Sequence, residues 1–485
     1  MKFNNTEKAI FAHFSPGFGG TEIPDWIFKY LENGLGGITL FSSNCPSLDV
    51  TRELILKIRA ISPNIIISLD EEGGDVTRLF VPEGSPFPTP ALLGRCNDLE
   101  LTESSFKELG KILKSIGVDL NLAPVADVAT QSDNPIVAVR SFGNDAELVS
   151  KHVVSAVKGL RSAGIASCIK HFPGHGGVLE DSHHNLPQLN GEMDELINTH
   201  LKPFISAIGD GVEAIMMGHI LLAAIDSISP ASCSSLITRS LLRKSLGFEG
   251  LVVTDALDMG ALGGTKKIHT SALRAISAGA DLLCFSGLYD QSSFVDNSLV
   301  AIREAIEKGE IERQALEDNA EKIWRWRPPV ATDLSPVSLP EASKFKTGVN
   351  YQGNLSLSTD QISLIELSAD PTIAAGFVGW GLRRPFIRAG IKVKLESSDI
   401  DLSTHNQGCL VVAFRDAFRD NKILVALDRI NRSRPDAIFV DMGWPTRSFN
   451  PKNIIRTFGS SALASEIAVA FLTESPISSK EISSK

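Results

Sequence analysis

The chain has 485 residues, of which 43% are hydrophobic and 21% are charged, the balance of a globular protein with large apolar cores. It carries 57 acidic and 47 basic residues, giving a net charge of −10, and no basic run stands out. The composition therefore argues against a nucleic-acid-binding protein and against a surface attracted to anionic membranes.

The N-terminal segment MKFNNTEKAIFAHF lacks the charged region followed by an apolar region that marks a secretory signal. No apolar run reaches the length of a membrane helix, so we expect a cytoplasmic protein without membrane insertion. None of the six cysteines forms a CxxC pair, and a chain of this length predicts no disulfide framework.

Eight short apolar runs divide the first two thirds of the chain, and helical stretches lie between them. Strands that are buried on both sides have such continuous apolar sequences. The predicted strands are Ala9–His13, Gly37–Phe41, Ile65–Leu69, Val118–Ala123, Ile165–Lys170, Ala214–Met217, Leu251–Thr254 and Asp281–Phe285. The predicted helices include Leu48–Ala60, Glu103–Ile116, Asp145–Ala163 and Thr270–Ala278. This alternation predicts a TIM-like (β/α)8 barrel, with a doubly wound sheet as the alternative.

The sequence changes character at Arg327–Glu341, where four prolines interrupt any apolar period. We expect three parts: a catalytic barrel at 1–327, an extended proline-rich linker at 328–344, and a smaller α/β sandwich domain at 345–485. In the last part the predicted strands are Ile362–Leu367, Ala374–Val378, Cys409–Phe414 and Ala437–Val440, and Ala462–Phe471 is a predicted helix.

Titratable residues follow five of the predicted barrel strands. The active site of a (β/α)8 barrel lies at the carboxyl ends of its strands, so these side chains are expected at one face. They include Asp70, Arg78, Asp127, Arg140, Lys170, His171, His219 and Asp255. Each one taken alone is better explained as a cap or a solvated loop residue. The coincidence across five strands favours a functional site.

Asp255 ends the apolar run of GLVVTDALDMGA, a position that would hold a nucleophile rigidly. The alternative is an N-cap for a helix that starts near Ala256, and the spacing does not separate the two.

Asp181 and His183 are two residues apart, so in an extended loop their side chains point the same way. A carboxylate that accepts from one imidazole nitrogen raises the basicity of the other, which makes His183 a candidate general acid/base. His184 is its rival, but the alternation places it on the opposite side. Glycines at 174, 176 and 177 predict either a loop that is free to adopt positive φ and can carry His183 in and out of the site, or a plain strand-to-helix turn.

Lys170 and His171 end a buried strand, where they are either sugar-hydroxyl donors or members of core ion pairs. Four histidines lie within residues 171–184, but their spacing matches no compact zinc motif, so we expect no metal and no other cofactor.

The segments KHFPGHG, DSH and VVTDALDM resemble glycoside hydrolase family 3, specifically its bacterial exo-acting β-N-acetylglucosaminidases that act on cell-wall fragments. The resemblance covers residues 1–330 as a barrel, and the whole chain resembles the two-domain members. It implies that Asp255 is the nucleophile of a retaining reaction and that the His183–Asp181 dyad is its acid/base. It also implies sugar contacts by these residues: Asp70, Arg78, Arg140, Lys170 and His171.

Three positions depart from the family pattern, namely Asp75, Gly177 and Glu180. Other functions stay open. A phosphorylase of the same family is one, because a histidine acid/base does not repel an incoming phosphate. A sugar-binding protein without catalysis and a metal-dependent hydrolase are the others.

Overall fold

The computed structural model describes residues 3–132, 134, 136–287, 292–357, 359–399 and 408–473. The chain forms two compact units. Unit 1 comprises Met1–Glu71, Leu99–Asn134 and Asn144–Ser338, and unit 2 comprises Glu72–Asp98, Pro135–Gly143 and Leu339–Lys485. Two segments from the first third of the chain therefore belong with the C-terminal residues.

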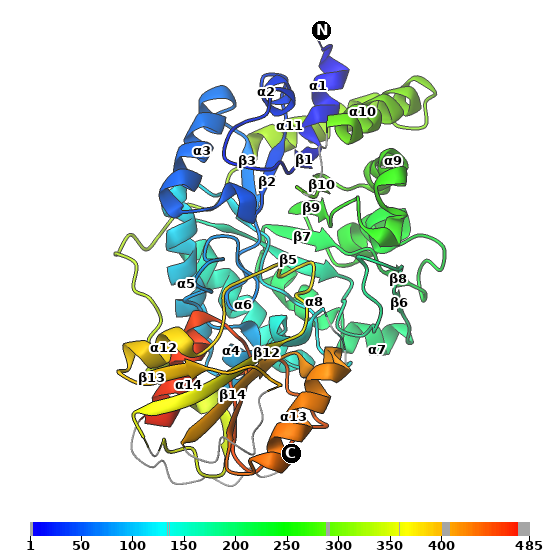
Figure 1. The fold of residues 1–485 in the computed structure, drawn as a ribbon. Helices are drawn as coiled ribbons and strands as arrows, with labels where there is room; N and C mark the ends of the chain where they lie inside the picture. The colour runs from blue at the N-terminus through cyan, green and yellow to red at the C-terminus, as the bar shows by residue number, and fades with distance from the viewer. Residues whose placement is uncertain are drawn as a thin grey trace. The chain divides into compact units, whose positions relative to one another are not determined.

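Among the described residues, unit 1 contains eight parallel strands that form the barrel. They are β1 (Phe14–Pro16), β2 (Gly37–Leu40), β3 (Ile66–Leu69), β4 (Leu120–Asn121), β5 (Ala166–Phe172), β7 (Ala214–Met217), β9 (Leu251–Thr254) and β10 (Leu283–Phe285). The order β2-β3-β4-β5-β7-β9 forms one parallel sheet, and β1 pairs with β10. A parallel bridge between Val253 and Leu282 joins β9 to the β10 segment. Figure 1 shows these strands following one another through unit 1.

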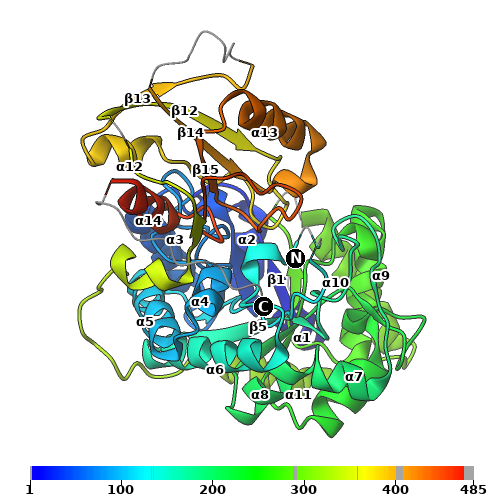
Figure 2. The ribbon, with the colours of Figure 1, turned by 90° about the horizontal axis from the view of Figure 1, so that it is seen from below.

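Helices surround the strands of unit 1, as Figure 2 shows. They are α1 (Asn5–Ala12), α2 (Asp25–Leu31), α3 (Leu48–Ile61), α5 (Leu99–Ile116), α6 (Ala146–Ser162), α7 (Met193–Asn198), α8 (Lys202–Gly209), α9 (Ile268–Ala278), α10 (Ser292–Glu307) and α11 (Arg313–Arg325). A π-helix spans Leu236–Ser245, and the short strands β6 (Gln188–Leu189) and β8 (Leu221–Leu222) pair with each other. The prediction of a TIM-like α/β barrel is confirmed.

The first predicted strand was placed wrongly, because Ala9–His13 lies mostly in helix α1 and the strand follows at Phe14–Pro16. The helix is fixed by a capping box: Asn4 accepts from the Glu7 N–H, and the Glu7 side chain accepts from the Asn4 N–H. The apolar residues of this segment are buried, so its hydrophobicity alone did not distinguish a helix from a strand.

The proline-rich segment after α11 contains no helix or strand over residues 327–340, all of which are described. Its first part is held against unit 1. The Asp333 carboxylate lies 3.1 Å from the Lys107 ammonium and 3.4 Å from that of Lys111, and the Thr332 N–H donates to the Ser162 carbonyl. Residues 332–333 are therefore fixed by ion pairs and backbone bonds.

Unit 2 contains a six-stranded sheet in the order β11-β16-β15-β14-β12-β13. Its strands are β11 (Asn350–Gln352), β12 (Gln361–Ser368), β13 (Lys392–Leu395), β14 (Cys409–Arg415), β15 (Ile438–Asp441) and β16 (Ile454–Arg456). Its helices are α4 (Pro90–Cys96), α12 (Arg383–Arg388), α13 (Asn421–Ser433) and α14 (Ala462–Thr473). All pairs are parallel except β11 with β16.

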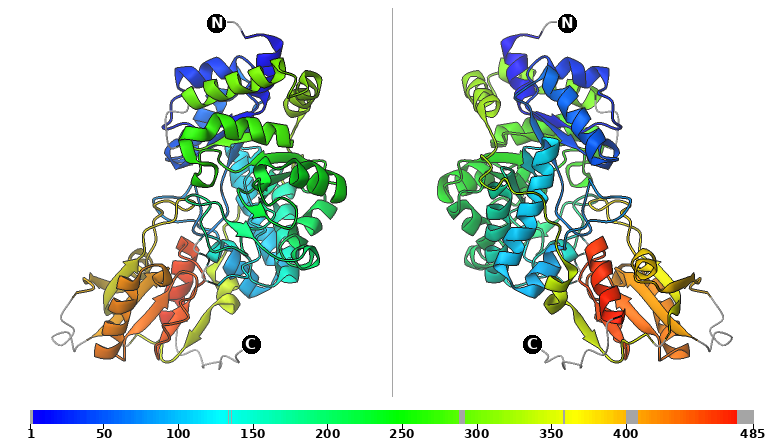
Figure 3. Two further views of the ribbon diagram at one scale, coloured as in Figure 1. Left: turned by 90° about the vertical axis from the view of Figure 1, so that its right-hand side faces the viewer. Right: turned by 90° about the vertical axis from the view of Figure 1, so that its left-hand side faces the viewer.

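Helices cover both faces of this sheet, and Figure 3 shows α13 and α14 on opposite sides. Leu410, Val412 and Phe414 alternate along β14 and belong to the apolar cluster that includes Leu427 of α13. The residues between them are buried as well, which explains the continuous apolar sequence of this strand. The α/β sandwich expected for the C-terminal part is thus observed.

The predicted strand Ala374–Val378 is not formed. The Gly376 N–H donates to the Thr372 carbonyl in a turn, where Gly376 has φ +67°. The sheet edge is occupied instead by β13, whose sequence KVKL is largely exposed. Lysines suit an exposed edge because they oppose pairing with another chain, and this polar sequence gave no apolar signal. None of the helices in the described part of the chain combines the length and the hydrophobicity that a membrane span requires.

Candidate active site

The carboxyl ends of the unit 1 strands bring together most of the predicted site residues. Asp70 follows β3, Lys170 and His171 lie near the end of β5, and Asp255 follows β9. The backbone fixes the last of these, because the Asp255 N–H donates to the Met217 carbonyl at the end of β7. The rigid parallel ladder thus positions each side chain on the same edge.

Asp255 is not a helix N-cap. In the described range 136–287 it is followed by a turn, and the next α-helix, α9, begins only at Ile268. Its Oδ1 accepts from the Ala256 N–H at 2.8 Å. Burial raises the pKa of Asp255, but the imidazoles of His171, His219 and His183 outweigh burial, so that this pKa lies below the ordinary value. The carboxylate is therefore kept ionised, the form that a nucleophile requires.

His219 supports the residue next to Asp255. Its Nε2 lies 2.8 Å from the Ala256 carbonyl oxygen, which can only accept, so Nε2 carries the hydrogen. Its Nδ1 then accepts from the Ser232 hydroxyl at 2.8 Å. Burial lowers the pKa of His219 despite the nearby Asp255 carboxylate, which favours this neutral ring. The sequence marks His219 only as a residue after a strand, and its partner Ser232 gave no signal.

Asp181 and His183 contact each other as their spacing predicts. His183 Nδ1 lies 2.7 Å from Asp181 Oδ1, and the His183 N–H donates to the same oxygen at 2.8 Å. The predicted extended loop is wrong, however, because the N–H groups of His184 and Asn185 both donate to the Asp181 carbonyl and form a turn. Asp181 acts as the cap of this turn, and that geometry brings the two side chains together.

The two side chains of this dyad are about one fifth exposed, at 20% for Asp181 and 19% for His183. Burial raises the pKa of Asp181, but the hydrogen bond from His183 outweighs it and holds that pKa below its ordinary value. Asp181 therefore stays ionised and fixes the Nδ1–H form of the ring, which leaves Nε2 for proton transfer. His184 is exposed.

Lys170 and His171 each pair with a carboxylate. Lys170 Nζ lies 2.6 Å from Asp70 Oδ1, and His171 Nδ1 lies 2.8 Å from Asp127 Oδ2. Burial raises the pKa of Asp127, but the neighbouring His171 and His175 hold it below its ordinary value. Ion pairs or charge-assisted hydrogen bonds thus orient both predicted sugar donors. This arrangement is compatible with donors to sugar hydroxyls and with core ion pairs, the two roles that the sequence left open.

Arg78 and Arg140 belong to unit 2, so they are described with that unit. Arg140 forms a bidentate pair with Glu72, with Nε 2.8 Å from Oε2 and Nη2 2.7 Å from Oε1. Arg78 Nη1 donates to the Ala374 carbonyl at 3.0 Å. Both guanidinium groups are buried. Their predicted contacts with sugar stay predictions.

Close packing accounts for two of the three glycines at 174–177. Only Gly174 has a positive φ, at +131°. A Cβ on Gly176 would lie 2.0 Å from the Val128 carbonyl oxygen, and one on Gly177 would lie 2.6 Å from the His200 ring. These two glycines are required by close packing, so in this structure the loop is docked. The predicted movement of the loop stays a prediction.

Asp75, one of the departures from the family pattern, has a place in unit 2. Its Oδ1 accepts from the Ser460 N–H at 2.7 Å. Burial raises the pKa of Asp75 to about 6, although the charge of Arg415 opposes this shift. Within the described residues, no three His, Cys, Asp or Glu side chains are grouped so as to hold a metal ion.

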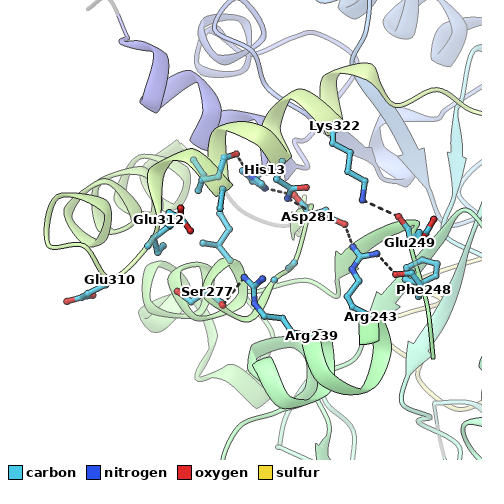
Figure 4. A pocket seen from close by; sticks show the side chains of 17 residues that line it. His13, Arg239, Arg243, Phe248, Glu249, Ser277, Asp281, Glu310, Glu312 and Lys322 are labelled. Atoms are coloured by element: carbon cyan, nitrogen blue, oxygen red, sulfur yellow. Dashed lines mark hydrogen bonds and ion pairs between the residues drawn. The ribbon is translucent and has the colours of Figure 1, made fainter. Parts of the chain in front are cut away.

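A separate cavity of about 940 Å³ lies at the amino-terminal ends of β9 and β10, away from Asp255. Figure 4 shows several of its polar side chains paired with one another or with backbone, among them Arg243 and Lys322. Arg243 bonds to Asp281 Oδ2 at 2.6 Å, and Lys322 donates to the Glu249 carbonyl at 3.1 Å. At this face of a barrel such contacts stabilise the fold.

Known proteins resemble both the barrel and the whole chain. The sequence pattern described as the glycosyl hydrolase family 3 N terminal domain matches residues 21–326. A protein named β-hexosaminidase from Chromobacterium violaceum is 34% identical over 256 residues, which cover 51% of this chain and 71% of that protein.

Two solved structures extend the comparison. A glycoside hydrolase family 3 β-N-acetylglucosaminidase from Paenibacillus sp. str. FPU-7 is similar over 96% of both chains, with a TM-score of 0.83 and 26% identity. NagZ from Neisseria gonorrhoeae matches 65% of this chain and 98% of its own, with a TM-score of 0.54 and 26% identity. The chain therefore belongs to glycosyl hydrolase family 3 and is a glycoside hydrolase.

Proposed function

We propose that the enzyme is a retaining exo-β-N-acetylglucosaminidase that releases terminal β-linked N-acetylglucosamine from peptidoglycan-derived fragments. The observation that carries the proposal is the 2.7 Å contact between His183 Nδ1 and Asp181 Oδ1. This contact supplies an oriented proton donor at the barrel face that also holds the ionised Asp255. The name β-hexosaminidase of the relative and the β-N-acetylglucosaminidase activity named for the Paenibacillus structure support the same sugar.

In the first step, a carboxylate oxygen of Asp255 attacks the anomeric carbon as the glycosidic bond breaks. His183 Nε2 gives its proton to the departing oxygen, and Asp181 stabilises the ring through Nδ1. In the second step, Nε2 takes a proton from water while the water oxygen attacks the anomeric carbon and the bond to Asp255 breaks. Two displacements return the β configuration, as in retaining glycosidases that use two carboxyl groups.

Binding of the sugar is assigned to Asp70, Lys170 and His171 in unit 1, while the sugar contacts of Arg78 and Arg140 stay predictions from the sequence. The ion pair between Lys170 and Asp70 holds both side chains in place. Neither side chain therefore has to be ordered when the sugar binds. Ammonium and imidazole donors with carboxylate acceptors match the hydroxyl groups of a sugar ring.

The leaving group has a candidate site beside the dyad. A cavity of about 430 Å³ is lined by residues that include His184, Gly260, Lys267 and Arg274. Lys267 and Arg274 are exposed cations, and their charge favours a leaving group that carries carboxylates. A muropeptide fragment has this chemistry, which supports the assignment of peptidoglycan-derived substrates over neutral chitobiose.

The test is the turnover of an aryl β-N-acetylglucosaminide with and without inorganic phosphate, with the products followed by NMR. We expect free N-acetylglucosamine, first appearing as the β anomer, in both buffers. N-acetylglucosamine-1-phosphate formed only with phosphate would replace the hydrolase with a phosphorylase. The absence of turnover in both buffers would reject both reactions on this sugar and leave a sugar-binding protein or another glycoside as substrate.

A further inference from the structure

The dyad segment is held by a buried histidine that the mechanism does not use. His175 lies in the loop after β5, and its ring is only 1% exposed. Its Nε2 is 3.0 Å from the hydroxyl of Ser182, the residue between Asp181 and His183. Ser182 is itself buried, at 2% exposure. The bond therefore joins the loop after β5 to the centre of the dyad turn.

The tautomer of His175 follows from its surroundings. Among the described residues its Nδ1 has no hydrogen-bond partner. A buried N–H without a partner is rarer and costlier than a lone pair without one, so the hydrogen lies on Nε2 and is donated to Ser182 Oγ. Burial, together with the charge of His171, lowers the pKa of His175 to about 4, which keeps the ring neutral. His175 therefore acts as a hydrogen-bond donor without a charge.

His175 is itself anchored by Asp127, whose Oδ1 accepts from the His175 N–H at 2.6 Å. The same carboxylate accepts from the His171 N–H at 3.2 Å and from its ring at 2.8 Å. The Asn134 side-chain amide donates to the His175 carbonyl at 2.9 Å, which fixes the peptide on its other side. The donor that holds Ser182 is thus tied to the end of the barrel sheet.

We propose that His175 is a positioning residue, which orients the His183–Asp181 dyad through its hydrogen bond to Ser182. This inference rests on the proposed function, because it assigns a task only if His183 is the acid/base. Loss of the bond would let the turn shift, and a misplacement of the proton donor by a fraction of an ångström weakens proton transfer more than it weakens substrate binding.

The test compares kcat/KM on two substrates, because this constant reports the first bond-breaking step. A nitrophenyl β-N-acetylglucosaminide needs little protonation of its leaving group, whereas N,N′-diacetylchitobiose needs much. We expect Ser182→Ala and His175→Phe to lower kcat/KM on chitobiose by about tenfold, the value of one hydrogen bond. On the nitrophenyl substrate the loss should stay below about twofold, because general acid catalysis contributes little there.

Two further variants separate positioning from mere stability. His175→Gln keeps an N–H near the position of Nε2 and should restore most of the chitobiose activity that His175→Phe loses. The double variant His175→Phe/Ser182→Ala should lose no more than either single variant, because both remove the same bond. The matched control is His152→Gln, a buried histidine bonded to Thr102 in unit 1, which should leave the ratio of the two rates unchanged.

Equal losses on the two substrates, or a lower Tm with an unchanged ratio, would overturn the positioning role. His183→Ala serves as the reference. If His183→Ala lowers kcat/KM more on chitobiose than on the nitrophenyl substrate and Ser182→Ala does not, only the inference about His175 fails. If His183→Ala lowers kcat/KM equally on both substrates, the proposed acid/base role of His183 is itself rejected.

Discussion

The N–H of Gly260 donates to the carbonyl oxygen of His183 at 3.0 Å, and the next residue, Ala261, donates to the Ser182 carbonyl at 3.1 Å. The segment that follows Asp255 is therefore hydrogen-bonded to the segment that carries His183. Backbone hydrogen bonds thus connect the segment of the proposed nucleophile, Asp255, with the segment of the proposed acid/base, His183. A movement of the dyad relative to Gly260 and Ala261 would break these bonds.

Gly260→Ala should separate the two segments. A Cβ at this position would lie 2.5 Å from the His183 carbonyl oxygen and 2.7 Å from that of His184, and backbone atoms cannot yield as a flexible side chain does. We expect kcat/KM to fall on nitrophenyl and disaccharide substrates alike, with a loss of about 1–3 kcal/mol in unfolding free energy from overpacking. Gly19→Ala is the control, because a Cβ there meets nothing within 4 Å. Wild-type activity in Gly260→Ala would show that the connection is dispensable.

Asp255→Asn should abolish turnover while the fold is kept. The amide oxygen can still accept from the Ala256 N–H, but it cannot form the covalent intermediate. We expect kcat to fall by roughly four orders of magnitude or more, since no other group replaces a lost nucleophile. The rate is measured on the nitrophenyl substrate, and Tm is measured beside it. Asp145→Asn, at the N-cap of α6, is the matched control. A fall of less than about tenfold would remove Asp255 from the nucleophile role.

His183→Ala should distinguish substrates by their leaving groups. The loss in kcat/KM should reach about 10²–10⁴-fold on chitobiose, the usual value of general acid catalysis. The nitrophenyl substrate should lose far less, because its leaving group departs without a proton. The measurement is the pair of kcat/KM values for wild type and variant. A uniform loss would mean that His183 binds the sugar and does not protonate the leaving oxygen.

The barrel could be predicted from its apolar runs because parallel strands are buried on both faces and their sequences show it. The Asp181–His183 contact was also predicted, but from an extended loop, whereas a turn at Asp181 brings the two side chains together. The bonds of His175 to Ser182 and of Gly260 to His183 were not, because they join loops that only the folded unit brings together.

Local sequence also does not report which unit a segment joins. Arg78 lies in a stretch that the sequence assigns to the barrel, yet it packs in unit 2 and donates to the Ala374 carbonyl. The same holds for Arg140 and its partner Glu72, whose 68-residue separation in sequence hides their bidentate contact. Such pairings depend on the packing of segments distant in sequence, which no periodicity records.

Asp441, at the end of β15, should make the stability of unit 2 depend on pH. Its carboxyl group is buried at 1% exposure, and burial raises its pKa to about 7 from the ordinary 3.8. Hydrogen bonds from the Thr446 and Gly443 N–H groups, both at 3.3 Å, only partly oppose this shift. In the folded state the group therefore keeps its proton up to near neutrality, whereas in the unfolded chain it loses the proton near pH 4.

The sign follows from proton binding. Between about pH 4 and pH 7 the folded state binds the extra proton, so the contribution of Asp441 to the unfolding free energy falls as the pH rises and is lost above the folded pKa. Asp441→Asn cannot ionise, so relative to wild type it should gain on the order of 2 kcal/mol on going from pH 5 to pH 8. Urea unfolding at the two pH values measures the difference. Asp428→Asn, on the exposed face of α13, is the control whose difference from wild type should not change with pH. The opposite result is a difference in unfolding free energy between Asp441→Asn and wild type that does not change with pH. It would mean that the Asp441 carboxyl group is already ionised in the folded state at pH 5. Its hydrogen bonds and the charge of Arg456 would then outweigh burial.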